Sequence, residues 1–272
     1  MGPDARRLEA PGDFNIEIDF KDLAVGANQL TITARGRHGR RTARTITLDY
    51  APRPVPLADY FIDWSTVRCI GEVAQVVDGR WMLTTDGVRS AEPGYDRIIA
   101  IGDITWTDYE VSMPVTVHSM DPRFANPAGG AAVGVLVRWS GHVAWGERRP
   151  REGWWPLGAA GWYGWENDLP APHLMLHGNR GRLLSNLGTG KRLETGRSYL
   201  FKVRASTRPR TGHRYAFKAW ARGEAEPPAW DLSGVEGADE PSAGSVLLIT
   251  HYVDATFGNV HIRPLRRHDV AR

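Results

Sequence analysis

The sequence predicts an all-β protein, an antiparallel β-sandwich preceded by a small N-terminal β appendage. Segments in which apolar and polar residues alternate recur along the chain, as half-buried strands require. Turn formers such as Asp78-Gly79 and Gly178-Asn179 separate these segments. No convincing amphipathic helix is present. Many short strands at fairly even spacing are typical of a sandwich or a jelly roll.

The N-terminal part, residues 14–50, is predicted to be β-structure. Phe14, Ile16 and Ile18 alternate with polar residues, and residues 30–34 and 45–50 do the same. Residues 51–56 then place a proline at every second position, which predicts a stiff, extended connector. We therefore expect a β-segment at residues 1–50, a proline-rich linker at 51–56 and a main domain at 57–272.

The main domain is predicted to be a series of short strands. They fall at residues 73–77, 80–84, 98–101, 109–118, 132–139, 173–177, 183–187, 198–205, 215–222, 245–252 and 258–264. Residues 119–131, 140–172 and 223–244 lack the alternation, and we expect loops there, around one end or one face of the sandwich.

The second of these predicted loops contains an unusually aromatic stretch, GWWPLGAAGWYGWEND, at residues 153–168. Its glycines and Pro156 argue against a regular helix or strand, so we expect an irregular surface loop. Flat aromatic faces near polar groups suit stacking on sugar rings. The alternative is a loop folded over the core with its indoles buried, because tryptophan is usually largely buried. The aromatic residues are Trp154, Trp155, Trp162, Tyr163 and Trp165.

Composition excludes several classes of protein. No apolar run approaches the ~20 residues that a membrane-spanning helix needs. Cys69 is the only cysteine, so neither an intrachain disulfide nor a cysteine-based zinc cluster can form. The net charge is only +3 and the arginines look scattered, apart from short clusters at 148–151 and 263–267, whereas nucleic-acid binding favours a focused basic stripe. We therefore expect no nucleic-acid partner, and an acidic polysaccharide is the more natural anionic one.

Several segments of the main domain resemble the concanavalin A-like lectin/glucanase jelly roll, in its laminin-G-like bacterial forms. Residues 78–81 (DGRW) and 108–115 (DYEVSMPV) resemble its opening strands, and 134–139 (GVLVRW) its central strand. Residues 199–204, 215–220 and 244–249 resemble its closing strands, and 254–260 (DATFGNV) its terminus. The resemblance covers about three quarters of the chain and implies a carbohydrate or polysaccharide partner. This fold hosts lectins, carbohydrate-binding modules, glycoside hydrolases and polysaccharide lyases, so it does not by itself settle function.

Residues 23–39 resemble the last strands of bacterial immunoglobulin-like modules, through the pattern L-x-x-G-x-N-x-L-T-I-T-A…G. A whole module needs about a hundred residues, so the match is to a partial module. Because such modules are extracellular, we expect a secreted or cell-surface parent protein. The first residues, MGPDARRLEA, contain no apolar signal-peptide core, and we interpret the chain as a mature fragment without its leader.

The candidate ligand-binding residues are the five rings of the aromatic stretch together with Arg138, His142 and Glu166. The rings would stack on sugars, and the three polar residues would hydrogen-bond to hydroxyls. The resemblance suggests no catalytic set: the Glu-x-Asp-x-x-Glu motif of the glucanase branch is absent, as are the Arg-x-Glu-x-Arg and Gln-x-His motifs of the lyase branch. Carboxylates in or beside the aromatic stretch could supply a hydrolytic pair; they are Glu147, Glu152, Glu166 and Asp168.

No cofactor is predicted, and no metal-ligand spacing is convincing in the sequence. The resemblance implies that a structural calcium ion is compatible with the fold, with Asp254, or Asp239 and Glu240, as its ligands. On strand 215–222, Lys218 and Trp220 share a face. They form either a stacking and charge site or an ordinary lysine that lies beside a core indole.

Three functions stay open, and we order them as follows. The first is a non-catalytic glycan-binding domain. The second is a glycan-active enzyme, a hydrolase or a lyase, that uses the same cleft. The third is a structural or adhesion module with the aromatic stretch buried. The missing carboxylate motif favours binding over hydrolysis, and the aromatic, charged insertion at 140–172 favours a ligand over a purely structural role.

Overall fold

The computed structural model describes residues 14, 16, 18, 20–121, 123–124, 130–142, 154–165, 171–188, 190–208 and 211–266. Their regular structure is almost entirely β-strand, and the helical segments are single 3₁₀ turns. The strands are β1 Gly26–Arg35, β2 Arg41–Tyr50, β3 Tyr60–Ile62, β4 Gln75–Asp78, β5 Trp81–Thr84, β6 Gly87–Ser90, β7 Arg97–Ile101, β8 Tyr109–Met120, β9 Ala132–Trp139, β10 Ala159–Gly164, β11 His173–Gly178, β12 Leu183–Asn186, β13 Ser198–Arg208, β14 Gly212–Ala221, β15 Leu232–Glu236, β16 Ser245–His251, β17 Val253–Phe257 and β18 Val260–Pro264. The 3₁₀ turns are η1 Phe20–Asp22, η2 Trp64–Thr66, η3 Ile70–Glu72 and η4 Asn179–Gly181.

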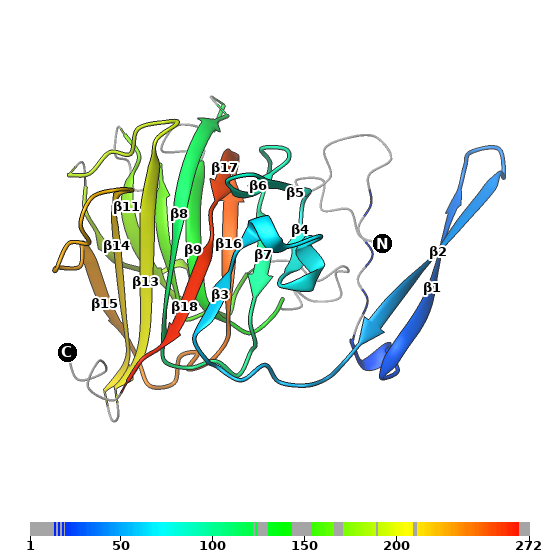
Figure 1. Cartoon of the computed structure of the whole chain (residues 1–272), viewed down its shortest axis with the longest axis horizontal. Helices are drawn as coiled ribbons and strands as arrows, with labels where there is room; N and C mark the ends of the chain where they lie inside the picture. Colours follow the sequence, from blue (N-terminus) through cyan, green and yellow to red (C-terminus); the bar gives the residue numbers. More distant parts are fainter. Residues whose placement is uncertain are drawn as a thin grey trace.

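Two antiparallel sheets pack face to face and form the body of the molecule (Figure 1). The seven-stranded sheet has the order β12-β11-β10-β9-β16-β7-β4. The nine-stranded sheet has the order β15-β14-β13-β8-β17-β6-β5, and β18 pairs with both β8 and β3 at its side. The predicted all-β antiparallel sandwich is therefore confirmed.

The main core lies between the two sheets. Alternate residues of β8, such as Val111 and Val115, face inward and meet Val133 and Val135 of β9 in one buried cluster. A second apolar cluster lies on the other face of the seven-stranded sheet and includes Leu136 of β9. We call this second group the outer cluster. Because β9 is buried on both faces, its sequence is almost continuously apolar instead of alternating.

Strand β10 corrects the prediction of an irregular loop over residues 140–172. It pairs with β9 and β11 along its whole length, in the middle of the seven-stranded sheet. The two glycines of β10 that argued against a strand are required by packing, because a Cβ added to Gly161 would come within 2.8 Å of the Val203 side chain, and one added to Gly164 within 2.4 Å of the Ala132 side chain. Gly134 of β9 lies opposite Trp162, and a Cβ added to Gly134 would come within 2.4 Å of the Trp162 ring. Glycine in a strand often marks such a close approach, so the local signal was misleading.

The alternation also missed four short strands, β3, β6, β15 and β17. Strand β15 lies inside the predicted loop 223–244, at the edge of the nine-stranded sheet. One strand was expected at residues 245–252 and the next at 258–264. Instead Tyr252 adopts a left-handed conformation, with φ 55°, and the chain passes there from the seven-stranded to the nine-stranded sheet.

At the N-terminal end, β1 and β2 form a separate two-stranded hairpin that projects from the sandwich (Figure 1). Phe14, Ile16 and Ile18, which we expected in a strand, are exposed and belong to none. The proline-rich stretch after the hairpin contacts the sandwich: the indole N–H of Trp106 donates to the Val55 carbonyl at 2.6 Å. The division into domains at 50 and 57 stays a prediction.

Candidate functional site

The five rings of the aromatic stretch do not form one exposed group. Trp162 and Tyr163 lie on β10 and are only 3% and 2% exposed. Because neighbouring residues of a strand face opposite ways, Trp162 enters the outer cluster and Tyr163 enters the core between the sheets. The Tyr163 hydroxyl accepts a hydrogen bond from the Leu193 amide at 3.1 Å. Neither ring offers a face to solvent, contrary to the expectation of open sugar-stacking rings.

Three of the indoles form a continuous stack on the outer face of the seven-stranded sheet. Trp154 stacks on Trp162 with ring centroids 5.7 Å apart, and Trp155 stacks on Trp154 at 4.4 Å. Trp154 and Trp155 are half-buried against the outer cluster. Trp165 is half-buried against the main core instead. Trp155 is thus the outer end of a stack that begins at the buried Trp162.

A polar pocket of about 600 Å³ lies beside this stack, at one end of the seven-stranded sheet. Its lining comes from the end of β9, the start of β10, the β11–β12 turn and the β15–β16 loop. These segments converge because β11, β10, β9 and β16 are neighbours in the sheet. We call it the Arg180 pocket, and it is lined by Ser140, Pro156, Asn179, Arg180, Asp239, Glu240, Pro241, Ser242 and Ala243.

Trp155 borders the Arg180 pocket on two sides. It directly precedes Pro156, a lining residue. Its ring also lies against Gly181, since a Cβ added there would be 3.5 Å from the indole, and Gly181 directly follows Arg180. A half-buried indole and a polar pocket therefore lie side by side.

The polar groups of the Arg180 pocket carry both signs of charge. Arg180 and Asp239 are exposed, and neither forms an ion pair within the described residues. Asn179 is held in place, because its side-chain amide donates to the Glu240 carboxylate at 2.5 Å and its backbone N–H donates to Glu236 at 3.1 Å. The buried Glu236 is itself bound by Arg182, and this partner raises the pKa of the Arg182 guanidinium.

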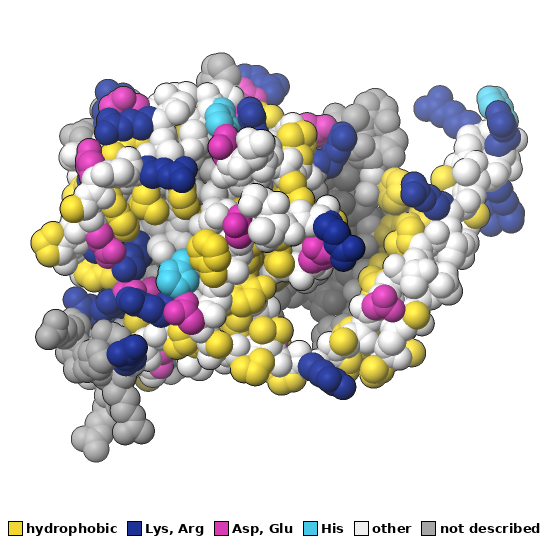
Figure 2. Space-filling view, viewed as in Figure 1, with side chains coloured by type: hydrophobic (Ala, Val, Ile, Leu, Met, Phe, Trp, Pro, Cys, Tyr) yellow, Lys and Arg dark blue, Asp and Glu magenta, His cyan; other side chains and the backbone are white. Residues whose placement is uncertain are grey.

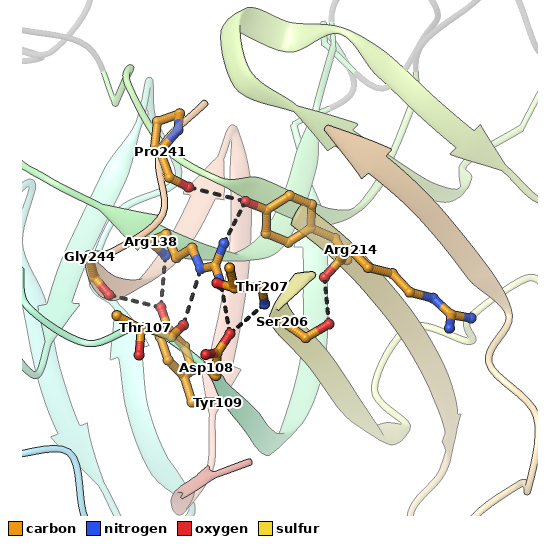
Figure 3. Close-up of polar contacts among 10 residues, drawn as sticks. Thr107, Asp108, Tyr109, Arg138, Ser206, Thr207, Arg214, Pro241 and Gly244 are labelled. Atoms are coloured by element: carbon orange, nitrogen blue, oxygen red, sulfur yellow. Dashed lines mark hydrogen bonds and ion pairs between the residues drawn. The ribbon is translucent and has the colours of Figure 1, made fainter. Parts of the chain in front are cut away.

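A buried network centred on Arg138 supports the wall of the Arg180 pocket from behind (Figure 3). Arg138 is 0% exposed, and its guanidinium donates to Asp108 at 3.1 Å, to Thr207 at 2.9 Å and to the Tyr215 hydroxyl at 3.3 Å. The Tyr215 hydroxyl in turn donates to the Pro241 carbonyl at 3.3 Å. Burial raises the pKa of Tyr215 to about 12, so its hydroxyl stays protonated.

The other end of the same wall is held by a second tyrosine. Tyr109 donates its hydroxyl proton to the Gly244 carbonyl at 3.0 Å and accepts the backbone N–H of Arg138 at 2.8 Å. The two tyrosines thus fix residues 241 and 244, and the lining residues Ser242 and Ala243 lie between them. The structure therefore places Arg138 behind the site as a positioning residue, whereas we predicted direct contact with ligand.

The remaining predicted site residues lie elsewhere. His142 contacts Asp78 of β4 at 3.7 Å and packs edge-on against Trp139; β4 is the edge strand at the opposite end of the sheet from β12. Glu166 lies outside the described residues, as do Glu147, Glu152 and Asp168. Sequence reasoning missed Asn179, Arg180 and the serines of the pocket, because no local pattern distinguishes them. Only Asp239 and Glu240 had been singled out, as calcium ligands.

The described residues do not fit the metal site that the resemblance implied. No group of three or more His, Cys, Asp or Glu side chains converges among them. Asp254 is engaged by Arg89 through two hydrogen bonds of 2.7 and 2.5 Å, so its oxygens already face a cation. Within the same part of the chain, no helix is long and apolar enough to cross a membrane.

Lys218 and Trp220 lie on the outer face of the nine-stranded sheet and are nearly buried. The Lys218 ammonium pairs with Glu226 at 2.8 Å, donates to the Pro227 carbonyl at 2.6 Å and lies 4.8 Å from the Trp230 ring centroid. The contacts with Glu226 and Pro227 use two of the three N–H donors of the ammonium group. This is the pattern expected of an ordinary lysine beside a core indole.

No protein-family model and no curated protein sequence matches the chain. Among solved structures, the Ca²⁺-bound exoplasmic/lumenal domain of VIP36 is 13% identical over 74% of this chain and 87% of that domain, with a TM-score of 0.47. The alginate lyase Aly36B is 14% identical over 77% of this chain and 98% of that one, with a TM-score of 0.48. A legume lectin-like domain from Entamoeba histolytica is 7% identical over 72% and 92%, with a TM-score of 0.39. The three TM-scores lie below 0.5 and the identities are at most 14%, so these likenesses carry no argument about the family or the function of this chain.

Proposed function

We propose that this chain is a glycan-binding β-sandwich domain whose site is the Arg180 pocket together with the half-buried indole of Trp155. One observation carries the proposal: a guanidinium, two carboxylates, an amide and two serine hydroxyls face one pocket beside a half-exposed indole. Sugar hydroxyls both donate and accept hydrogen bonds, so they match a mixed set of donors and acceptors. The indole adds an apolar face for the C–H side of the ring.

The size and rigidity of the pocket also support this function. Its volume of about 600 Å³ falls in the range of small-molecule sites and can accommodate one to two sugar rings. Buried hydrogen bonds from Tyr109 and Tyr215 hold one wall, and the contacts of Asn179 hold another. A preformed wall lowers the entropy lost on binding. In this proposal the domain belongs to a secreted or cell-surface protein, where glycan ligands are found.

The test is a titration of the full chain with neutral and uronic-acid oligosaccharides, followed by tryptophan fluorescence. Arg180→Ala and Asp239→Asn should each weaken binding about tenfold or more, since each removes charged hydrogen bonds to ligand. Arg222→Ala and Asp86→Asn are matched controls, because both residues are exposed, lie outside the pocket and form no ion pair with a described residue. Equal behaviour of site and control variants, or no glycan response at all, would remove the pocket from consideration.

The alternative function, a glycan-active enzyme, is favoured by one feature of the same pocket. Asp239 and Glu240 place two carboxylates beside the cation of Arg180, and such groups can serve as acid, base and charge stabiliser. Prolonged incubation with the bound glycan distinguishes the two functions. New reducing ends, or ultraviolet absorbance from unsaturated uronates, would establish catalysis; an unchanged glycan would establish binding alone.

A further inference from the structure

The hairpin of β1 and β2 carries a concentration of positive charge at its tip. Residues 35–44 read RGRHGRRTAR and contain five arginines, one histidine and no acidic residue. We call these five residues the arginine tip: Arg35, Arg37, Arg40, Arg41 and Arg44. The five arginines carry five positive charges, whereas the whole chain has a formal net charge of only +3. The rest of the chain therefore carries a net negative charge. Arginines that look scattered along the sequence are therefore gathered, in these five cases, at one end of the hairpin.

The arginine tip lies far out on a projecting element, where solvent and a large partner can reach it. Both strands of the hairpin are exposed along most of their length. Figure 2 shows the Lys and Arg side chains gathered at its far end, away from the sandwich. All five arginines are exposed, and none forms an ion pair with a described residue.

The register of the hairpin places like charges against each other. Arg35 and Arg41 are direct cross-strand partners at the end of the ladder, and like charges directly opposite are destabilising. The turn is closed by backbone bonds alone, from the Gly36 amide to the Arg40 carbonyl at 2.8 Å and from the Gly39 amide to the Gly36 carbonyl at 3.0 Å. The turn therefore needs no arginine for its geometry, and a bound polyanion would relieve the repulsion.

The surroundings of the arginine tip indicate which polyanion fits. Residues 35–44 contain no Phe, Tyr, Trp, Leu or Ile. The tip thus has no Trp, Tyr or Phe ring on which unstacked bases could stack. The exposed Ile46 of the hairpin, a large apolar side chain, lies on the opposite face from Arg35 and Arg41. The odd-numbered face that leads to Arg35 and Arg41 is lined with small polar groups, including the pairs Thr31–Thr45 and Gln29–Thr47. Hydroxyls and an amide beside guanidinium forks match a chain that carries both sugar hydroxyls and carboxylates or sulfates.

We propose that the arginine tip is a second binding site, separate from the Arg180 pocket, for an acidic polysaccharide that bears carboxylate or sulfate groups. Each guanidinium engages an anionic group through paired N–H donors, and the threonine face contacts the hydroxyls of the same polymer. The site rests on the charge of the hairpin and does not depend on the pocket. It adds a ligand class, acidic polymers, to the glycan binding proposed above.

The experiment measures binding of the full chain to polygalacturonate and to dextran sulfate, with neutral dextran as the uncharged control. The double variant Arg35→Gln/Arg41→Gln is compared with Arg53→Gln/Arg222→Gln, which removes the same charge from exposed arginines outside the tip. At about 0.1 M salt we expect the tip variant to lose about tenfold or more in affinity for the acidic polymers. The control variant should lose about twofold or less, because salt screens the attraction between a bound polymer and exposed charges more than a Debye length away. Binding of the intact chain should fall steeply as salt rises.

Two further arms assign the partner and separate the two sites. Duplex DNA and vesicles that contain anionic lipid are titrated in parallel; tighter, tip-dependent binding to either one would overturn the polysaccharide assignment. Arg180→Ala/Asp239→Asn should leave binding of dextran sulfate unchanged, and the tip variant should leave binding of a neutral pocket oligosaccharide unchanged. Equal losses of affinity in the tip and control variants, or no binding to either acidic polymer, would overturn the proposed site at the arginine tip. The Arg180 pocket is tested separately, by its own oligosaccharide titration.

Discussion

The hydroxyl of Tyr215, buried on β14, donates to the carbonyl of Pro241 in the β15–β16 loop at 3.3 Å. This contact joins the interior of the sandwich to the wall of the Arg180 pocket, because the same hydroxyl accepts from the fully buried Arg138. Tyr215→Phe should therefore cost about 1 kcal/mol of stability and also weaken binding of the pocket glycan. Urea unfolding and glycan titration measure the two effects.

Tyr199→Phe is the matched control for that substitution. Its hydroxyl, like that of Tyr215, bonds to one backbone group, here as acceptor from the Glu194 amide at 3.0 Å, but it lies outside the pocket. It should lose similar stability and keep its affinity. Equal losses of affinity in both variants would show that the Tyr215–Pro241 contact does not position the wall.

The role of Arg138 can be tested through stability. Its guanidinium makes four hydrogen bonds from a position with no exposure, to Thr107, Asp108, Thr207 and Tyr215. Arg138→Met should cost about 3–5 kcal/mol, the loss typical when one partner of a buried ion pair is removed. Chemical denaturation gives the value. A variant that is as stable as the parent yet fails to bind glycan would return Arg138 to direct ligand contact.

The indole stack predicts opposite effects at its two ends. Trp162→Ala removes a buried ring and should cost about 3–5 kcal/mol of unfolding free energy. Trp155→Ala removes a half-exposed ring and should cost much less stability but abolish the fluorescence response to glycan. Thermal melts and glycan titrations of both variants decide the point. If both variants unfold and no glycan perturbs the fluorescence, the stack is part of the core and the structural or adhesion function moves to first place.

Gly134 tests the packing that made β10 hard to recognise. Gly134→Ala would place a Cβ 2.4 Å from the Trp162 ring, so the stack must shift, at a cost of about 1–3 kcal/mol. Gly71→Ala is the control, because its added Cβ meets no atom within 4 Å. Unfolding midpoints in urea should separate the two variants; similar midpoints would mean that the ring moves freely.

Acid stability should depend on Glu110, which is buried on the outer face of the nine-stranded sheet. Burial by itself raises the pKa of Glu110, but Lys202, Arg204 and Arg263 together outweigh burial and hold the pKa below its ordinary value. A carboxyl with a lowered folded-state pKa contributes stability above its unfolded pKa of about 4.3. That contribution is lost as pH falls through the folded-state pKa.

The measurement is the urea midpoint between pH 7 and pH 3 for the parent chain and for Glu110→Gln. The variant should be less stable at pH 7 and show a flatter loss of stability in acid. Glu224→Gln, on the exposed side of a surface ion pair, should follow the parent. Parallel curves for Glu110→Gln and the parent would contradict the assignment.

The sequence by itself determined the fold class, because the period of two that marks a half-buried strand is a local property. Most strands of the sandwich, such as β9 and β13, fall close to where alternation or continuous apolar character predicts them. The same locality explains the failure at β10. Its glycines suggest a break until the packing partners are known: Gly161 lies against Val203 of the other sheet, a residue 42 positions further along the sequence.

Only the tertiary structure decided which segments form the Arg180 pocket. The Arg180 pocket takes its lining from four separate segments, and they meet because β11, β10, β9 and β16 are adjacent in one sheet. No period or motif within a segment encodes that order. The tertiary structure also decided the position of the Arg138 side chain. The backbone of Arg138 has a φ of 59°, and its side chain lies between the sheets, where it contacts Asp108 and Tyr215. A side chain that looked available at the end of an apolar strand thus became the buried support of the site.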